Sequence, residues 1–128
     1  MKICMIGTGY VGLVSGACFA DLGNTVLCVD KDKKKINLLN QNQIPIFEPG
    51  LQEMVSKNFS SGRIKFTNNL KMAVKNSDII FICVGTPTNK KNHSANLQYV
   101  FKAAKEISKF INKFKIIVTK STVPVTTG

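Results

Sequence analysis

The sequence predicts an α/β fold with a doubly wound parallel sheet, and three observations carry this prediction. A short apolar run at residues 3–6 ends at Gly7 and is followed by helical spacing, so that strand, tight turn and helix follow one another. Strand patterns and helix patterns then alternate along 128 residues without internal repeats. Residues 79–84 are apolar at every position, which is typical of a parallel strand buried on both faces. A chain of this length fits one domain.

The first turn carries the most specific pattern. Gly7, Gly9 and Gly12 stand in the order Gly-x-Gly-x-x-Gly. The first glycine permits the tight turn, the second lets a pyrophosphate approach the backbone, and the third lets the helix pack close to the strand. The phosphates would lie at the helix N-terminus, where unpaired N–H groups and the dipole favour negative charge. We expect the apolar face of this helix to consist of Val11, Val14 and Cys18.

The context of the glycine turn supports a Rossmann-like dinucleotide-binding domain. Gly23 ends the helix, residues 25–29 form a second strand, and Asp30 follows it. An acid at this position accepts hydrogen bonds from the adenosine ribose hydroxyls and repels a 2′-phosphate. The sequence therefore favours NAD over NADP, although the lysines that follow the acid leave NADP open. A glycine-rich turn that binds no ligand is the alternative.

Two helices are expected after the second strand. Asp32 is a suitable N-cap for a helix at residues 33–39, with Ile36 and Leu39 facing inward. Pro49 stands where a further helix can begin. The buried side of that helix would consist of Leu51, Met54 and Val55.

The second half of the chain continues the alternation. We expect a short strand at 64–66, a helix at 70–74, the buried strand at 79–84, a helix from residue 97 and a last strand at 115–119. The helix from residue 97 shows one apolar series and one basic series. The expected buried series is Leu97, Val100, Phe101, Ala104, Ile107 and Ile111, and the expected wet series is Lys102, Lys105 and Lys109. The last strand would deliver Ser121 and Thr122 to the same sheet edge as the glycine turn.

Composition restricts the classes of partner. The formal net charge is +11, but Arg63 is the only arginine and the lysines are not interleaved with stacking aromatic residues. We therefore favour a solvated basic surface over a nucleic-acid interface. No apolar stretch is long enough to span a membrane and the N-terminus leads straight into a strand, so we expect a cytoplasmic protein without a membrane partner. The four cysteines form no Cys-x-x-Cys pair and are expected to be buried, reduced thiols, and no metal site is predicted.

Four motifs together resemble one family. They are Gly7-Thr8-Gly9-Tyr10-Val11-Gly12-Leu13-Val14, Phe47-Glu48-Pro49-Gly50-Leu51, Val84-Gly85-Thr86-Pro87 and Lys120-Ser121-Thr122-Val123-Pro124-Val125. In this order and spacing they are similar to the N-terminal NAD-binding domain of the UDP-glucose/GDP-mannose dehydrogenase family. The resemblance covers essentially the whole chain.

The resemblance implies a set of cofactor contacts. Residues Gly7, Thr8, Gly9, Tyr10, Val11 and Gly12 would hold the pyrophosphate of NAD, and Asp30 and Lys35 would bind the adenosine ribose. Thr86 with Pro87 would lie near the nicotinamide ribose, and Ser121 and Thr122 would complete the cofactor site. Thr122 would also be the catalytic residue of this chain, because it matches a threonine that places the water or the substrate oxygen.

The resemblance also implies a reaction. Members of the family oxidise the C6 alcohol of a nucleotide sugar to a carboxylate with two NAD+ in succession, as in the conversion of UDP-glucose to UDP-glucuronate. In the family the nucleophilic cysteine lies further along the chain, and none of Cys4, Cys18, Cys28 and Cys83 matches it. We therefore expect residues 1–128 to be the NAD-binding part of a longer dehydrogenase, without its catalytic and substrate domain and inactive alone.

Other interpretations remain open. The related enzyme could be a GDP-mannose or UDP-N-acetylhexosamine dehydrogenase, or the chain could be a stand-alone NAD-binding module without catalysis. A weaker alternative is an adenine-cofactor protein of another class, such as a methyltransferase. Apolar surface at the last strand is expected to promote self-association, so a homo-oligomer is predicted.

Overall fold

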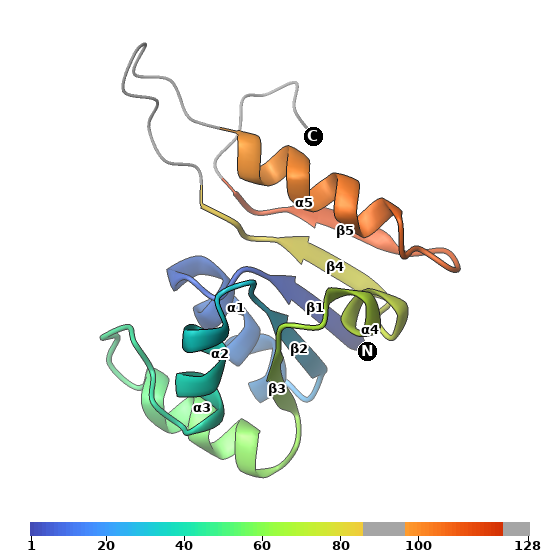
Figure 1. Cartoon of the computed structure of the whole chain (residues 1–128). Coiled ribbons are helices and arrows are strands. Elements are labelled where there is room, and N and C mark those ends of the chain that lie inside the picture. Colours follow the sequence, from blue (N-terminus) through green and yellow to red (C-terminus); the bar gives the residue numbers. More distant parts are fainter. Residues whose placement is uncertain (86–96, 122–128) are drawn as a thin grey trace, which may run out of the picture.

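A computed structural model describes residues 1–85 and 97–121 and shows a parallel sheet between two layers of helices (Figure 1). The elements, in chain order, are β1 (Lys2–Ile6), α1 (Tyr10–Asp21), β2 (Thr25–Val29), α2 (Lys33–Asn40), α3 (Leu51–Ser60), β3 (Ile64–Thr67), α4 (Leu70–Lys75), β4 (Ile79–Ile82), α5 (Gln98–Ser108) and β5 (Ile116–Thr119). The sheet order is β3-β2-β1-β4-β5, and every pair is parallel. The predicted fold class and the predicted succession of elements are confirmed.

The two faces of the sheet carry different helices. In Figure 1, α4 and α5 lie in front of the sheet, while α1 lies behind it. Ile3 and Met5 pack on the α1 side together with residues of α2 and α3. Cys4 and Ile6 alternate to the other side and pack against α4 and α5. Because β1 is buried on both faces, it forms the centre of the domain.

The short helices α2 and α3 follow their sequence signals. The Asp32 side chain accepts hydrogen bonds from the backbone N–H groups of Lys34 and Lys35, so it caps α2 as predicted. Ile36 and Leu39 are buried, as predicted. In α3, Leu51 and Val55 are buried, and the helix begins after Gly50, which has a φ of +80°. The left-handed backbone at Gly50 sets the start of α3 at Leu51, two residues beyond Pro49.

The predicted buried face of α1 is wrong for two of its three residues. Val11 and Cys18 are exposed and Val14 is half-buried. The buried face consists of Gly12, Leu13, Gly16, Ala17 and Ala20. Because these residues are mostly small, α1 lies close against the sheet, and Leu13 is the large side chain among them.

The predicted buried face of α5 is also partly wrong. Val100 and Ile107 are buried as predicted, but the third buried residue is Ala103. Phe101 is 58% exposed and Ile111 is 46% exposed, and Ala104 is exposed as well. The apolar residues of this segment therefore form two faces, and only one of them packs on the sheet.

Strand β4 is interior to the sheet, but it is not buried on both faces. Ile80 and Ile82 are buried beneath α4 and α5. Ile79 and Phe81 lie on the α1 side and are half-buried. The rings of Phe81 and Phe19 have centroids 5.1 Å apart, so α1 reaches this face and covers part of it.

All four cysteines lie within the described residues and are free. Burial raises the pKa of Cys4 to about 12 and that of Cys83 to about 11, and burial also raises the pKa of Cys28. The prediction of buried thiols is wrong for Cys18, because it lies on the exposed side of α1. Among the described helices, none is long and apolar enough to cross a membrane.

Candidate cofactor site

The sheet order places a natural ligand crevice at β1. From β1 the chain adds β2 and β3 on one side, and then returns to add β4 and β5 on the other. The connections therefore reverse direction between β1 and β4. In open parallel sheets, ligands bind outside the carboxyl ends of the strands at such a reversal. The glycine turn between β1 and α1 lies at this point.

The three glycines of the turn have separate structural roles. Gly7 has a φ of +104°, and its N–H donates to the carbonyl oxygen of Val29 at 2.7 Å. A Cβ on Gly12 would lie 2.0 Å from the carbonyl oxygen of Gly7, so only glycine fits between α1 and the turn. A Cβ on Gly9 would meet no atom within 4 Å. Gly9 therefore faces open space at the start of α1, where a phosphate could approach the backbone.

Asp30 is joined directly to the glycine turn. Its Oδ2 accepts hydrogen bonds from the backbone N–H of Thr8 at 3.0 Å and from the Thr8 hydroxyl at 2.8 Å. Its Oδ1 accepts a third bond from the backbone N–H of Asp32 at 3.0 Å. Thr8 is 1% exposed, so its hydroxyl is held in a fixed position. A carboxylate has about four acceptor positions, so Asp30 keeps capacity for a further donor.

The environment of Asp30 favours the ionised form. Burial alone would raise the pKa of its carboxyl, but the opposing interactions are stronger together. They are the hydrogen bonds from Asp32 and Thr8 and the positive charge of Lys35, and they hold the pKa below its usual value. Asp30 is therefore a carboxylate at neutral pH, able to accept hydrogen bonds.

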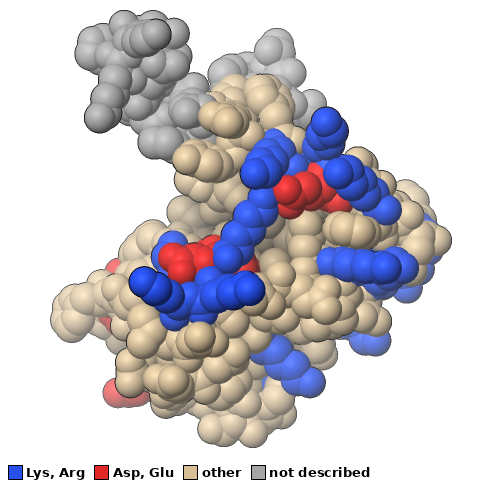
Figure 2. Space-filling view, in the orientation of Figure 1, with Lys and Arg blue, Asp and Glu red and all other residues tan. Residues whose placement is uncertain are grey.

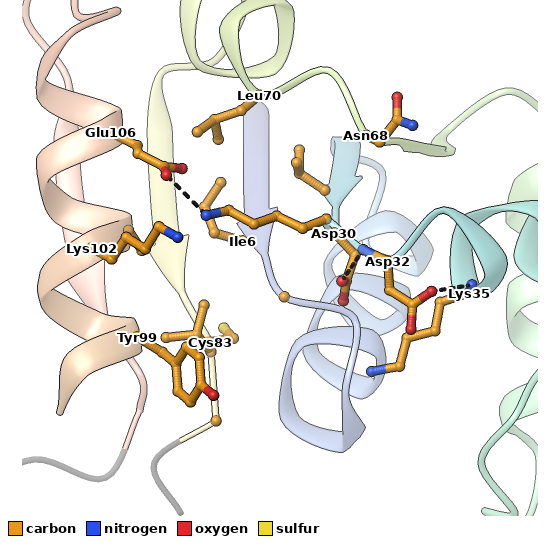
Figure 3. Close-up of a pocket in the computed structure, with 16 residues that line it drawn as sticks. Ile6, Asp30, Asp32, Lys35, Asn68, Leu70, Cys83, Tyr99, Lys102 and Glu106 are labelled. Carbon is orange, nitrogen blue, oxygen red and sulfur yellow. Dashed lines mark hydrogen bonds and ion pairs between the residues drawn. The ribbon is translucent and has the colours of Figure 1, made fainter. Parts of the chain in front are cut away.

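A pocket of about 400 Å³ opens beside Asp30, which is a size suited to a small ligand. One part of its lining is apolar and consists of Ile6, Val29, Leu70, Cys83, Val84, Tyr99 and Ala103. The charged part consists of Asp30, Lys31, Asp32, Lys35, Lys102 and Glu106. Figure 3 shows Tyr99, Lys102 and Glu106 projecting from α5 on one side of the pocket and Asp30, Asp32 and Lys35 on the other. A flat aromatic base with a polar sugar would match both parts.

Charges of both signs surround the pocket. Figure 2 shows basic side chains on both sides of a hollow, with acidic side chains on each side as well. One ion pair joins the two sides, because the Lys31 ammonium lies 2.9 Å from Glu106 Oε1. The predicted solvated basic surface is therefore interrupted at the pocket by carboxylates.

At the start of α1, Tyr10 is 54% exposed and its hydroxyl donates to Glu48 Oε2 at 3.0 Å. This hydrogen bond raises the pKa of Tyr10. Glu48 belongs to the sequence motif at residues 47–51, and it is half-buried. The bond connects the loop before α3 with the glycine turn.

The structure brings most of the predicted site residues together. The turn from Gly7 to Gly12 and Asp30 are in direct contact, and Lys35 lines the same pocket. Ser121 lies at the carboxyl end of β4, where its hydroxyl donates to the Val84 carbonyl oxygen at 2.7 Å. Three predicted residues, Thr86, Pro87 and Thr122, lie outside the described residues.

Sequence reasoning missed the α5 wall of the pocket. Lys102 is exposed, as predicted, but the sequence analysis assigns no site role to it, to Tyr99 or to Glu106. All three line the pocket, together with Ala103. Their spacing of three and four residues puts them on one helix side, and this signal was present in the sequence.

The comparisons with known proteins decide the family. Residues 1–128 match the sequence model of the UDP-glucose/GDP-mannose dehydrogenase family, NAD binding domain. The chain belongs to this family. Because the match is to the NAD-binding domain of the family, NAD is the cofactor of this domain.

Other members of the UDP-glucose/GDP-mannose dehydrogenase family show how far the similarity extends. The chain is 59% identical over 128 residues to the UDP-glucose 6-dehydrogenase of Rhizobium meliloti, covering 100% of this chain and 29% of that protein. The solved UDP-glucose dehydrogenase of Pyrobaculum islandicum superposes with a TM-score of 0.93 at 37% identity, covering 98% of this chain and 30% of that one. The solved GDP-mannose dehydrogenase of Pseudomonas aeruginosa gives a TM-score of 0.91 at 40% identity, covering 96% and 29%. The chain thus spans less than a third of these relatives.

Proposed function

We propose that residues 1–128 bind NAD through the glycine turn, Asp30 and Lys35, as the NAD-binding part of a longer nucleotide-sugar dehydrogenase. The observation that carries this proposal is the pair of hydrogen bonds from Thr8 to Asp30 Oδ2. They place a carboxylate suited to ribose hydroxyls against a backbone turn suited to a pyrophosphate. A phosphate-binding turn without a sugar ligand would not need this carboxylate.

Each residue of the proposed site has a role that fits its chemistry. The backbone from Gly7 to Gly12, including Thr8, Tyr10 and Val11, would cradle the pyrophosphate at the α1 N-terminus. Asp30 would accept hydrogen bonds from the adenosine ribose, and Lys35 would add a positive charge beside it. Ser121 would approach the cofactor from the β4–β5 side. Thr86, Pro87 and Thr122 are proposed to act near the nicotinamide, with Thr122 placing the reacting oxygen.

The proposed reaction is oxidation of UDP-glucose to UDP-glucuronate in the cytoplasm. Two NAD+ in succession would each take one hydride from C6, and water would supply the second carboxylate oxygen. The name of the Rhizobium meliloti relative supports this substrate. The name of the Pseudomonas aeruginosa structure favours GDP-mannose as the second candidate, and a UDP-N-acetylhexosamine is the remaining sugar alternative.

We expect the 128-residue chain alone to bind the cofactor without turnover. Three of its thiols are buried, and their raised pKa values keep them protonated and unreactive at neutral pH. The exposed Cys18 lies in the last turns of α1, about 12 Å along the helix from Tyr10. None of these thiols is suited to form a covalent intermediate beside the nicotinamide. A stand-alone NAD-binding module would share this behaviour.

The binding test is a calorimetric titration of the chain with NAD+ and NADP+. We expect NAD+ to bind more tightly, and Asp30→Ala to weaken it about 10- to 100-fold, since hydrogen bonds to a charged group are lost. Glu53→Ala is the control, because Glu53 is an exposed acid on α3 outside the pocket. Equal affinity of the Asp30→Ala variant and the control would refute the assigned ribose contact.

The turnover test adds UDP-glucose or GDP-mannose to the chain with NAD+ and follows NADH absorbance. No NADH is expected from residues 1–128. Formation of NADH would show that the chain alone carries the catalytic groups. The same assay on a longer protein that contains this chain would distinguish the two nucleotide sugars by their kcat/KM values.

A further inference from the structure

The ion pair between Lys31 and Glu106 crosses the pocket close to the residue that would distinguish NAD from NADP, Asp30. Lys31 follows Asp30 directly in the chain, and its ammonium is 2.9 Å from Glu106 Oε1, 75 residues away on α5. Both residues line the pocket beside the proposed ribose site. Figure 3 shows Glu106 pointing from α5 into the pocket, with a dashed line to its partner. The cation nearest to Asp30 in the sequence is thus already paired with an acid.

NADP differs from NAD by a phosphate on the ribose hydroxyl that Asp30 would bind. Sites that accept this phosphate supply a cation close to the ribose. Lys31 would be that cation by its place after the acid. Of the other acids in the pocket, Asp32 is engaged by the N–H groups of α2 and Asp30 by Thr8 and Asp32. Glu106 is therefore the acid that neutralises Lys31.

We propose that Glu106 is a specificity-determining residue, which favours NAD over NADP by pairing with Lys31 and adding a negative charge to the pocket. This inference rests on the proposed function, in which the pocket beside Asp30 takes the adenosine half of the cofactor. Asp30 repels the 2′-phosphate directly. Glu106 acts from the opposite wall by pairing with one of the three lysines of the pocket, so that only Lys35 and Lys102 remain to attract the phosphate.

The effect should be moderate. The side chain of Lys31 is 65% exposed and that of Glu106 is 26% exposed, so water and salt screen their interaction. We expect Glu106→Gln to raise the affinity for NADP+ relative to NAD+ about three- to tenfold at low ionic strength, because exposed ion pairs are weak. The gain should shrink as salt is added. The ratio of the two affinities is the informative quantity, since both cofactors carry the same pyrophosphate.

The experiment titrates the whole chain with NAD+ and with NADP+ in five forms: the unaltered chain, Glu106→Gln, Lys31→Gln, the double variant and Glu53→Gln. Glu53→Gln removes the same charge from an exposed position outside the pocket. We expect Glu106→Gln alone to shift the affinity ratio. Lys31→Gln leaves the Glu106 carboxylate unpaired, so it should not raise the affinity for NADP+ relative to NAD+, and it should abolish the gain in the Glu106→Gln background.

The outcomes separate this inference from the function on which it rests. If the unaltered chain binds neither cofactor, the proposed NAD site fails and this inference fails with it. If the unaltered chain binds NAD+ but Glu106→Gln and Glu53→Gln give the same ratio, only the role of Glu106 is overturned. A gain that persists in the double variant would overturn the role of Lys31 as the cation that Glu106 neutralises. Thermal unfolding of each variant checks that α5 remains folded.

Discussion

The two flanks of the sheet are built differently. The closed flank, which consists of β1, β2 and β3 with α1, α2 and α3, buries most of the apolar residues of its strands and fixes Asp30 through three hydrogen bonds. The open flank, which consists of β4 and β5 with α5, leaves Ile116 49% and Ile117 41% exposed. Within the described residues, the closed flank can thus orient a ligand by itself, whereas the open flank exposes apolar surface to solvent. The residues that would contact the adenosine half of the cofactor should therefore keep their positions without a ligand. Self-association of the chain should involve β5.

The largest expected effect tests the closed flank at Gly12. A Cβ there would lie 2.0 Å from the Gly7 carbonyl oxygen, so Gly12→Ala must separate α1 from β1. We expect a loss of about 1–3 kcal/mol or more in the free energy of unfolding, as for other overpacked sites. Gly9→Ala is the matched control, because its Cβ meets no atom within 4 Å. It should keep the stability and weaken NAD+ binding. Equal melting temperatures for Gly12→Ala and the unaltered chain would contradict the close packing.

The next effect tests how Asp30 is oriented. Thr8→Val keeps the shape of the side chain but removes the hydroxyl that donates to Asp30 Oδ2. We expect a loss of about 1–3 kcal/mol in the free energy of unfolding at neutral pH, together with weaker NAD+ binding. Thr8→Ser keeps the hydroxyl and should retain most of both properties.

The same variant has a pH signature. The pKa of Asp30 is lowered in the folded chain, so its contribution to stability is present above the unfolded pKa of about 3.9 and is lost as the pH falls through the folded value. Removal of the Thr8 hydroxyl should raise the folded pKa. The stability difference between Thr8→Val and the unaltered chain should therefore shrink in acid. A difference that is constant from neutral pH to below pH 3 would mean that the hydroxyl does not act through the Asp30 charge.

A smaller effect concerns the open flank. Phe114 is 87% exposed beside the partly exposed β5, so we predict concentration-dependent self-association of the 128-residue chain. Ile116→Lys should reduce it, since a charge on an edge strand opposes pairing. Light scattering over a range of concentrations is the measurement, with Leu22→Lys, an exposed apolar residue after α1, as the control. A chain that is monomeric at every concentration would contradict the prediction.

The smallest effect is expected at Tyr10. Tyr10→Phe removes the hydrogen bond to Glu48, and this bond lies at the exposed surface. The melting temperature should be nearly unchanged, because water replaces such partners at low cost. Proteolysis in the loop before α3 should become faster if this bond restrains the loop. An unchanged rate of proteolysis would show that the Tyr10–Glu48 hydrogen bond does not restrain the loop.

The comparison of flanks also explains what the sequence could predict. The parallel fold, the succession of strands and helices along the chain and the α2 cap follow from signals in the sequence, and these predictions are confirmed. The predicted buried faces of α1 and α5 are wrong in part. In α1 the contact face is made of Gly16, Ala17 and other small residues, which periodicity of large apolar side chains does not reveal. In α5 two apolar faces compete, and only tertiary packing selects the one with Ala103.

The site shows the same division. The contact of Thr8 with Asp30 joins residues 22 positions apart, and the pair of Lys31 with Glu106 joins residues 75 positions apart. A sequence pattern can nominate Asp30 because its distance from the glycine turn is characteristic of one structural unit. It does not show which lysine meets which acid across the pocket.

The hydrogen bonds that hold Asp30 come from the polypeptide itself, and this has a consequence for heat stability. Because Thr8 and Asp32 fix the carboxylate, little ordering of the ribose site should accompany binding. NAD+ should then stabilise the folded chain by simple mass action, about 2.7 kcal/mol at a hundredfold excess over Kd and about 1.4 kcal/mol for each further tenfold. A series of melting curves at increasing NAD+ concentration would thus report the dissociation constant without any enzymatic assay.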